Sequence, residues 1–419
     1  MKYTPSMLLF ILSLLTASCE DMRRGFRDGF TSVPGDESAS ATLDHATDRD
    51  TLATDRWTYV AVDSAKAMWG EFDAPEWLRY FGLAAADLND DGFLDIVTGR
   101  NVYLNPGGDM TGAWQKLDLG RNVDANLVID YAGQPAILAE ALPDVVLFTG
   151  GDQGTDWTSS QVVAQVPATG HHNGQGYKVA DVFADHGGDE VIYASLGGLF
   201  IVDPSTETPW TVTLAGKDAS DEGFSTADLD GDGDIDLISG FRTEGGDPEV
   251  PTVVVWFENP GEIREDWTRH EIGTTVFATD RVEAADLDGD GKTDVVISEE
   301  RYPGLEPDAS LFVYFQRDTG WVREKVVTQY SMNNLSLPDL DQDGDVDIVT
   351  SEHKGEELNL QVWLNDGSGN FTLQPIDQGK ESHLGTQPFD MDGDGDLDLI
   401  SIGWDQHQYV HLWRNDAID

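Results

Sequence analysis

The sequence predicts an all-β protein, a seven-bladed β-propeller made of four-stranded antiparallel blades. Three observations carry this prediction. From residue 57 onward an Asp-rich loop recurs about every 50 residues, a spacing typical of propeller blades. Short apolar runs rich in Val and Ile, separated by turn sequences, accompany each loop. A strand-like segment before the first loop matches a strand that the last unit lacks.

The Asp-rich loop is the clearest mark of the repeat. Its copies start at residues 87, 130, 181, 228, 286, 339 and 390, which gives seven units. The copy at 181, DVFADHGGD, is degenerate, and the copy at 130 is nearly erased between Asp130 and Asp144. The five well-kept copies are DLNDDGFLD (87–95), DLDGDGDID (228–236), DLDGDGKTD (286–294), DLDQDGDVD (339–347) and DMDGDGDLD (390–398).

Each unit continues with strands in the same order. A short β run such as DIVTG follows the loop, and in the second unit DVVLFTG (144–150) is expected to take this place. The next run ends in a turn such as WFENPG (256–261) or WLNDG (363–367). With one strand before the loop, each unit holds four antiparallel strands. The last of the four opens with an aromatic residue, which is Trp114, Trp157, Trp210, Trp267, Trp321 or Phe371.

The two ends of the repeat region predict how the ring closes. The last unit stops at 413–416, with no aromatic-led strand after it, whereas WTYVAV (57–62) is such a strand and stands before the first loop. We therefore expect the N-terminal strand to complete the C-terminal blade. That closure would leave only short outer edges.

Composition excludes several classes of partner. The chain has 25 Lys and Arg against 78 Asp and Glu, a formal net charge of −53. Binding to nucleic acid needs clustered Lys and Arg, so it is excluded, and docking on anionic lipid headgroups is disfavoured. Hydrophobic residues make up 39% and there are 12 Trp, which is enough apolar surface for a core. The single Cys excludes a disulfide framework and a Cys-rich metal site.

The N-terminus predicts export. Lys2 precedes an apolar run at 7–15 that is too short to span a bilayer, and small residues then lead to Cys19. This arrangement resembles a bacterial lipoprotein signal, which implies lipidation of Cys19; the alternative is an ordinary secretory signal. We expect residues 1–19 to be the signal peptide, 20–55 a flexible acidic tether and 56–419 the propeller. The expected location is the outer membrane or cell surface through the lipid anchor alone, or else the periplasm or the medium.

The repeated D-x-D-x-D-G-x-x-D loops, the DIVTG-type strands and the WFENPG-type turns resemble the FG-GAP/VCBS repeat family over residues 57–419. That family contains integrin-like seven-bladed propellers, so the resemblance implies this fold and calcium in the loops. Its members include adhesion modules, binding proteins and some carbohydrate-active lyases and dehydratases. The resemblance therefore implies no single activity.

The loops themselves predict about five structural Ca²⁺ sites. Each nonamer places side-chain oxygens at positions 1, 3, 5 and 9, Gly at position 6 for a sharp turn, and a backbone carbonyl at position 7, which Lys292 can supply as well as any residue. The candidate ligands are Asp87, Asn89, Asp91 and Asp95; Asp228, Asp230, Asp232 and Asp236; Asp286, Asp288, Asp290 and Asp294; Asp339, Asp341, Asp343 and Asp347; and Asp390, Asp392, Asp394 and Asp398.

The alternative is that Asp and Gly merely form Asx turns. Against it, every well-kept copy gathers acids in nine residues, and these acids would repel one another strongly without a cation. In the unit at 181, Phe183 and His186 replace the residues at positions 3 and 6, so no metal is expected there. The unit at 130 has lost the loop.

Strand parity separates the two faces of the ring. With the Asp loop between strands 1 and 2, the turn between strands 3 and 4 lies on the same face. The loops into strand 1 and between strands 2 and 3 lie on the opposite face, which we call the mouth. We predict ligand contacts there from His171, His172, Arg242, Arg301, Tyr302, His353, His383, Trp404, Asp405 and His407. The same loops also supply Glu222, Asp280, Arg281, Glu300, Asn333, Lys354 and Glu381.

Each of these residues has a structural alternative. A His can bond to the backbone of the next blade, an Arg can pair with surrounding acids, and Trp404 can pack inside a blade. The sequence favours a module that binds a glycan, or a cell-surface protein, at the mouth, because Trp and Tyr stack on sugar rings and Arg and Asn bond to hydroxyls or carboxylates.

The alternative function is a polysaccharide lyase or dehydratase that acts by β-elimination on uronic-acid glycans. Arg242 or Arg301 would neutralise the uronate, and a His or Tyr would move the proton. The candidates for the proton transfer are His172, His353, His383 and Tyr302. No local motif fixes these roles.

Overall fold

The structure is a computed structural model that describes residues 51–68, 82–150, 155–157, 159–168, 176–183, 188–241, 252–301, 304, 306–382 and 386–418. The predicted signal peptide with Cys19, and the tether up to residue 50, lie outside these residues. Within the described ranges, no helix is long and apolar enough to cross a membrane.

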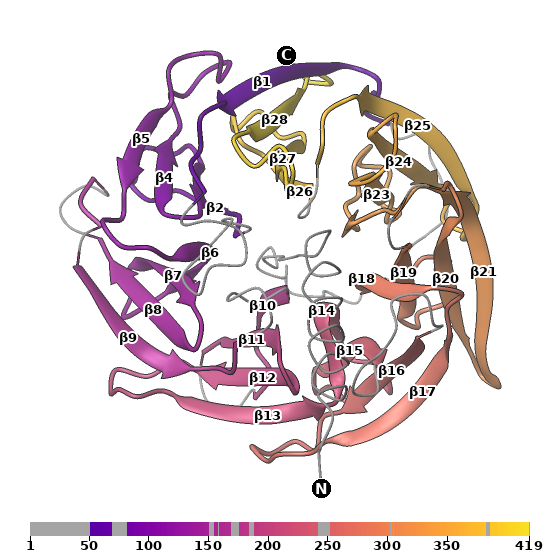
Figure 1. Ribbon diagram of the computed structural model, residues 1–419. Coiled ribbons are helices and arrows are strands. Elements are labelled where there is room, and N and C mark those ends of the chain that lie inside the picture. Colours follow the sequence, from indigo (N-terminus) through magenta and orange to yellow (C-terminus); the bar gives the residue numbers. More distant parts are fainter. Residues whose placement is uncertain are drawn as a thin grey trace, which may run out of the picture.

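The described residues form 28 strands in seven four-stranded antiparallel sheets, arranged as a ring of blades (Figure 1). Blade 1 contains β2 (Ala84–Ala86), β3 (Asp95–Thr98), β4 (Asn101–Leu104) and β5 (Gln115–Asp118). Blade 2 contains β6 (Asp124–Asp130), β7 (Pro135–Ala141), β8 (Asp144–Thr149) and β9 (Ser159–Gln165). Blade 3 contains β10 (Gly176–Ala180), β11 (Glu190–Ser195), β12 (Gly198–Asp203) and β13 (Thr211–Lys217).

The remaining blades follow the same order. Blade 4 contains β14 (Ala219–Ala227), β15 (Asp236–Phe241), β16 (Val253–Glu258) and β17 (Thr268–Thr274). Blade 5 contains β18 (Ala278–Ala285), β19 (Asp294–Glu300), β20 (Ala309–Arg317) and β21 (Gly320–Gln329). Blade 6 contains β22 (Asn334–Ser336), β23 (Ile348–Ser351), β24 (Asn359–Asn365) and β25 (Phe371–Gln378). Blade 7 contains β26 (Gln387–Phe389), β27 (Asp398–Ile402), β28 (Val410–Asn415) and β1 (Trp57–Asp63).

The predicted closure is confirmed. β1 pairs antiparallel with β28, from Trp57 opposite Asn415 to Asp63 opposite Val410. The Tyr59 hydroxyl hydrogen-bonds to Nδ1 of His411 at 2.9 Å across the pair. Asp63 then joins this strand to blade 1, because its carboxylate accepts from the Tyr103 hydroxyl at 2.7 Å and from Lys116 Nζ at 2.6 Å. The first and last strands thus close the ring.

The core lies between blades. Seven clusters of buried apolar side chains each join two neighbouring blades. The aromatic residue that leads each outer strand packs into the cluster shared with the preceding blade, as Trp210 does between blades 2 and 3. Trp57 takes this place between blades 6 and 7. Burying such a side chain stabilises the fold by about 1.5–3 kcal/mol or more, which explains why the repeat keeps an aromatic there.

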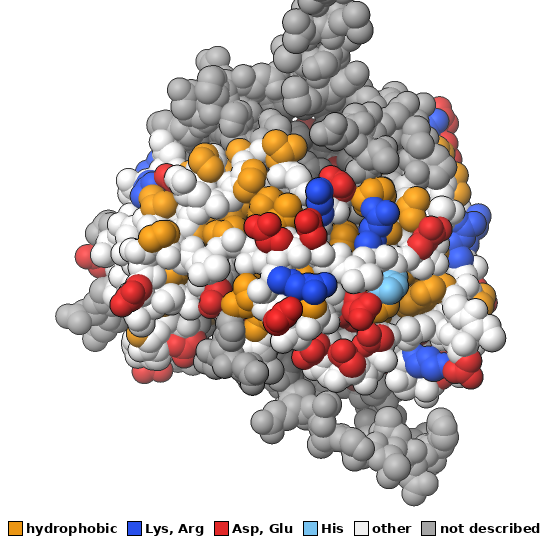
Figure 2. Space-filling model, turned by 90° about the horizontal axis from the view of Figure 1, so that it is seen from below, with side chains coloured by type: hydrophobic (Ala, Val, Ile, Leu, Met, Phe, Trp, Pro, Cys, Tyr) orange, Lys and Arg blue, Asp and Glu red, His pale blue; other side chains and the backbone are white. Residues whose placement is uncertain are grey.

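The side wall carries both apolar and charged side chains (Figure 2). Figure 2 shows basic and acidic side chains interspersed over it, with acidic ones more frequent toward the lower edge of the view. On the outer strand of blade 4, His270 stacks on Trp256 with ring centroids 4.4 Å apart and bonds to Glu258 at 2.6 Å. This histidine therefore has a structural role.

One strand expectation was wrong. The run DVVLFT is β8, the third strand of blade 2, and PAILAEA (β7) is the second. The hairpin that replaces the Asp loop spans only residues 131–134, closed by Tyr131 and Gln134, which hydrogen-bond to each other's backbone. The erased loop is short, so the space between Asp130 and Asp144 holds a whole strand.

Candidate functional site

The Asp-rich loops share one backbone geometry. In blade 4, the first Asp of the loop, Asp228, accepts N–H groups from Gly231 at 2.7 Å and from Gly233 at 3.0 Å. Both glycines have positive φ, 78° and 98°. Positions 4 and 6 have positive φ in all five well-kept loops, so the chain curls around the first carboxylate, and Gly at position 6 fits a conformation that L side chains rarely adopt.

The ninth residue of each loop is a buried clamp. Asp236 is 1% exposed; its Oδ2 accepts from the Leu229 N–H at 2.9 Å and its Oδ1 from the Asn259 N–H at 2.8 Å. The carboxylate therefore ties the hairpin between strands 1 and 2 to the turn between strands 3 and 4. The same pair of bonds is made by Asp95, Asp294, Asp347 and Asp398.

Burial raises the pKa of these clamp carboxyls, because desolvation disfavours the charged form more than the two backbone bonds favour it. The pKa rises to about 6 for Asp95 and Asp294, to about 7 for Asp236 and Asp347, and to about 8 for Asp398. Neighbouring loop carboxylates add to the rise. A bound cation would reverse this balance.

Four loops bring three carboxylates together. Oxygens of Asp228, Asp230 and Asp236 lie within 4.8 Å of one another. Oxygens on one Ca²⁺, at 2.3–2.6 Å from the ion, are at most about 5 Å apart, so these residues fit the ion. The other three groups are Asp286, Asp288 and Asp290; Asp339, Asp341 and Asp347; and Asp390, Asp392 and Asp398.

The loop at 87–95 differs. Asn89 stands where the other loops have Asp, and its Nδ2 donates to Asp91 Oδ2 at 2.9 Å. Among the described residues, no group of three carboxylates forms in this loop. Of the five loops, this one offers the fewest clustered carboxylates to a cation.

Arg317 lies across the loop at 286–294, a contact that sequence reasoning missed. Its guanidinium donates to Asp288 and, at 3.2 Å, to Asp290. It is the last residue of β20, so strand pairing places it beside the loop. Its charge offsets part of the negative charge of this loop.

The Asn of the turn between strands 3 and 4 connects blades, a second role that the sequence did not reveal. Asn365 Nδ2 donates to the Val346 carbonyl at 3.0 Å in its own blade and to the Leu287 carbonyl at 2.8 Å in blade 5. Asn105 and Asn259 bridge their neighbours in the same way, and Gln316 reaches the Leu229 carbonyl of blade 4 at 2.8 Å. The recurrence of Asn in the turn motif could have indicated this.

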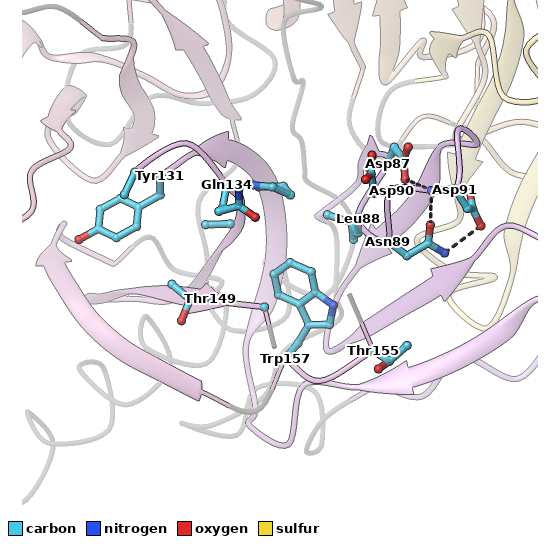
Figure 3. A pocket seen from close by; sticks show the side chains of 14 residues that line it. Asp87, Leu88, Asn89, Asp90, Asp91, Tyr131, Gln134, Thr149, Thr155 and Trp157 are labelled. Atoms are coloured by element: carbon cyan, nitrogen blue, oxygen red, sulfur yellow. Dashed lines mark hydrogen bonds between the residues drawn. The ribbon is translucent and has the colours of Figure 1, made fainter. Parts of the chain in front are cut away.

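The degenerate units leave hollows on the loop face. Between the loop at 87–91 and the short hairpin at 131–134 lies a cavity of about 1050 Å³, with Trp157 between the two (Figure 3). A smaller one, about 440 Å³, lies on the other side of the hairpin, next to Asp203 and Ser205. Trp157 is 3% exposed and packs in the core of blades 1 and 2, so it offers no free ring face for stacking.

In the unit at 181, Glu190 replaces the clamp. Its Oε2 accepts the N–H groups of Val182 at 2.8 Å and Phe183 at 3.1 Å. Glu190 is the tenth residue counted from Asp181, so this loop is one residue longer than the others. The prediction that this unit holds no metal is not tested, because residues 184–187 lie outside the described ranges.

At the mouth, Glu381 organises several of the predicted ligand residues. Its carboxylate accepts from Nδ1 of His353 at 2.7 Å and from the backbone N–H groups of Trp404, Asp405 and Gln406 at 2.6–3.0 Å. These bonds hold its pKa below the usual range despite burial. His353 is 5% exposed, and Trp404, 1% exposed, packs among apolar residues of blades 7 and 1. Both side chains thus have structural contacts, which was the alternative to ligand binding that the sequence allowed.

Arg301 lies apart from that group. Its Nε is 3.4 Å from Asp308, and its guanidinium stands 5.0 Å from the centre of the Phe277 ring. His407 is half-buried and Asp405 exposed. The other predicted contacts, His171, His172, Arg242, Tyr302 and His383, lie outside the described residues.

A cluster of charged side chains lies at the mouth in blades 4 to 6. The sequence supplies its members as separate loop residues and does not indicate that they meet. Oxygens of Glu222, Asp280 and Glu300 lie within 4.8 Å of one another. Arg281 donates to Asp280 Oδ1 at 3.0 Å, and Lys354 donates to Glu300 Oε1. All five side chains are buried or nearly so.

Comparison with known proteins supports the repeat. Residues 228–297 and 339–401, which contain the loops of blades 4 to 7, match the FG-GAP-like repeat family. No curated protein matches the chain. Among similar solved structures, an exotype rhamnogalacturonan lyase is 13% identical, covering 85% of this chain and 76% of that one, with a TM-score of 0.46. A nidogen–laminin complex is 10% identical, covering 64% of this chain and 86% of that one, with a TM-score of 0.40. The Dos1 propeller is 12% identical, covering 86% of this chain and 95% of that one, with a TM-score of 0.46.

Proposed function

This chain carries FG-GAP-like repeats in a seven-bladed β-propeller, and we propose that it is an exported, calcium-stabilised module that binds carbohydrate at the mouth. In the loops, the carboxylates at positions 1 and 3, with the one at position 5 or 9, would hold Ca²⁺. Each ion would pin one hairpin and offset part of the net charge of −53.

The observation that carries the carbohydrate proposal is a group of buried polar atoms at the mouth half of the blades. Asn333 is 0% exposed, and neither its Nδ2 nor its Oδ1 has a hydrogen-bond partner in the described part of the chain. The same holds for Oδ1 of Asn334 and for the hydroxyls of Ser220, Ser239 and Ser298. An unpaired buried group costs about 1–3 kcal/mol. A ligand with many hydroxyls, which both donate and accept, would satisfy such atoms better than an apolar one.

The test is a binding titration of the calcium-saturated chain against a panel of neutral and uronic-acid oligosaccharides. We expect at least one of them to bind, and Asn333→Ala to weaken it about tenfold. Asn370→Ala is the control, because that Asn is exposed on the loop face. If no oligosaccharide bound, or if folded Asn333→Ala bound as tightly as the wild type, the proposal would fail.

The same panel distinguishes binding from catalysis. Plain binding predicts no ultraviolet-absorbing unsaturated product from the uronic-acid substrates. Product formation that His353→Ala abolishes and His270→Ala does not would replace this proposal with β-elimination. His270 is a suitable control because it lies on the outer strand β17.

Export through a lipid anchor rests on the sequence around Cys19. We expect radiolabelled palmitate to be incorporated into the wild-type protein expressed in a bacterium and not into Cys19→Ser. Equal labelling of both would exclude this anchor.

A further inference from the structure

We propose that Glu222, Asp280 and Glu300 form a binding site for a hard divalent cation, Ca²⁺ in the first instance, at the mouth and separate from the Asp-rich loops. This site does not depend on the carbohydrate proposal. One oxygen from each residue lies within 4.8 Å of the other two, which matches oxygens that share one Ca²⁺. Glu222 is 2% exposed, and Asp280 and Glu300 are 0% exposed.

Two oxygens of the cluster lack partners. Asp280 Oδ2 and Glu300 Oε2 are buried and accept no hydrogen bond in the described part of the chain. Their sister oxygens are taken by Arg281 and Lys354. A buried carboxylate oxygen left unpaired is strongly unfavourable, so these two atoms indicate a missing positive ligand.

Two cations reach the cluster in the described part of the chain. Arg281 pairs with Asp280 Oδ1 and Lys354 pairs with Glu300 Oε1. The next acid along β18, Glu283, pairs with Lys178, whose Nζ donates to both of its carboxylate oxygens at 2.7 and 3.0 Å. Arg301 is directed to Asp308. A divalent ion would give Asp280 Oδ2 and Glu300 Oε2 a positive partner.

Two shifts in strand register bring the acids together. The register of β14 against β15 shifts between Ala219 and Phe224, and that of β18 against β19 shifts between Thr279 and Arg281. Glu222 and Asp280 lie within these irregular stretches, and irregularities such as bulges re-aim side chains. Gly223 permits the close approach of the two strands, because a Cβ there would lie 2.6 Å from the Asp280 carbonyl oxygen.

The donor set selects the class of ion. All three donors are carboxylates, without His or Cys, which favours Ca²⁺, Mg²⁺ or Mn²⁺ over zinc or copper. The site differs from the loop sites in taking its ligands from three strands of two blades rather than from nine consecutive residues.

The first test counts calcium bound per full-length chain by equilibrium dialysis against CaCl₂. Glu222→Gln and Asp280→Asn should each bind one ion fewer than the wild type. Glu324→Gln, an exposed carboxyl on β21, should bind as many as the wild type. An unchanged count in folded Glu222→Gln would overturn the site.

Asp280 also pairs with the buried Arg281, so its replacement can unfold the chain for another reason. Wild-type crystals grown with Mn²⁺ give a second reading that needs no variant. An anomalous peak among the three carboxylates is expected beside peaks in the loops. Peaks in the loops with none at this cluster would overturn the site, and so would the absence of all peaks.

Discussion

In blade 4, Asp236 Oδ1 accepts the backbone N–H of Asn259 at 2.8 Å, and the amide of Asn259 in turn donates to the Val182 carbonyl of blade 3 at 2.9 Å. The loop carboxylate thus fixes the turn, and the turn fixes the neighbouring blade. This pattern connects local loop geometry to the stability of the whole ring.

The bridging Asn can be tested in blade 6. Asn365→Ala removes both side-chain bonds and leaves the Leu287 and Val346 carbonyls without that donor, so we expect a loss of about 2–3 kcal/mol in the free energy of unfolding. Asn370→Ala, in the same hairpin, removes only bonds from an exposed amide to Asp366 and should change it by less than about 1 kcal/mol. Urea unfolding measures both. Equal effects would mean that the bridge between blades contributes nothing.

The clamp carboxyls predict a pH dependence of the metal-free protein. The folded pKa is about 7 for Asp236 and Asp347 and about 8 for Asp398, above the ordinary value for Asp. The folded state therefore binds more protons than the unfolded state, so stability falls as the pH rises from the ordinary value of 3.8 to the folded pKa and levels off above it. In EDTA, the urea midpoint should fall as the pH rises from about 5 to about 8.5.

Calcium should remove that fall, because the ion favours the charged carboxylates. The same urea series in saturating CaCl₂ should show a flat or rising midpoint from pH 6.5 to 8.5. A parallel decline with and without calcium would contradict the assignment of these carboxylates to metal sites.

His411 predicts the opposite trend at lower pH. Burial in β28 lowers its pKa from 6.5 to about 4, so the unfolded chain takes up the proton first, and stability is lost as pH falls from about 6.5 to 4. The loss amounts to about 3 kcal/mol. In saturating CaCl₂, which favours the charged clamp carboxylates, His411→Gln should flatten this part of the profile relative to the wild type. Identical slopes for the two proteins would exclude His411 as the cause.

Much of the fold follows from the sequence because the blade repeats. The Asp loops, the aromatic that leads each outer strand and the isolated Trp57 strand each depend on a local pattern, and the register of β1 on β28 agrees with them. Blade 2 was misread because its hairpin at 131–134 has lost the loop that marks the register of the other units.

The contacts between blades were not predictable in the same way. Asn365 reads as a turn residue, and only the packing of blade 6 on blade 5 gives its amide a carbonyl to bond. Glu222 and Asp280 are 58 residues apart and meet through two shifts in strand register, which no spacing in the sequence encodes. Arg317 likewise reaches its loop only through strand pairing.

The most direct test of the account is the melting temperature of the full-length chain with calcium and with EDTA. At 10 mM Ca²⁺ and affinities of about 0.1–1 mM, each loop site contributes about 1.4–2.7 kcal/mol. Four such sites correspond to a melting temperature lower by about 10 °C in EDTA and restored by added Ca²⁺. Asp230→Asn should reduce that difference. An identical melting temperature in EDTA and in calcium would show that the loops do not hold the ring through metal ions.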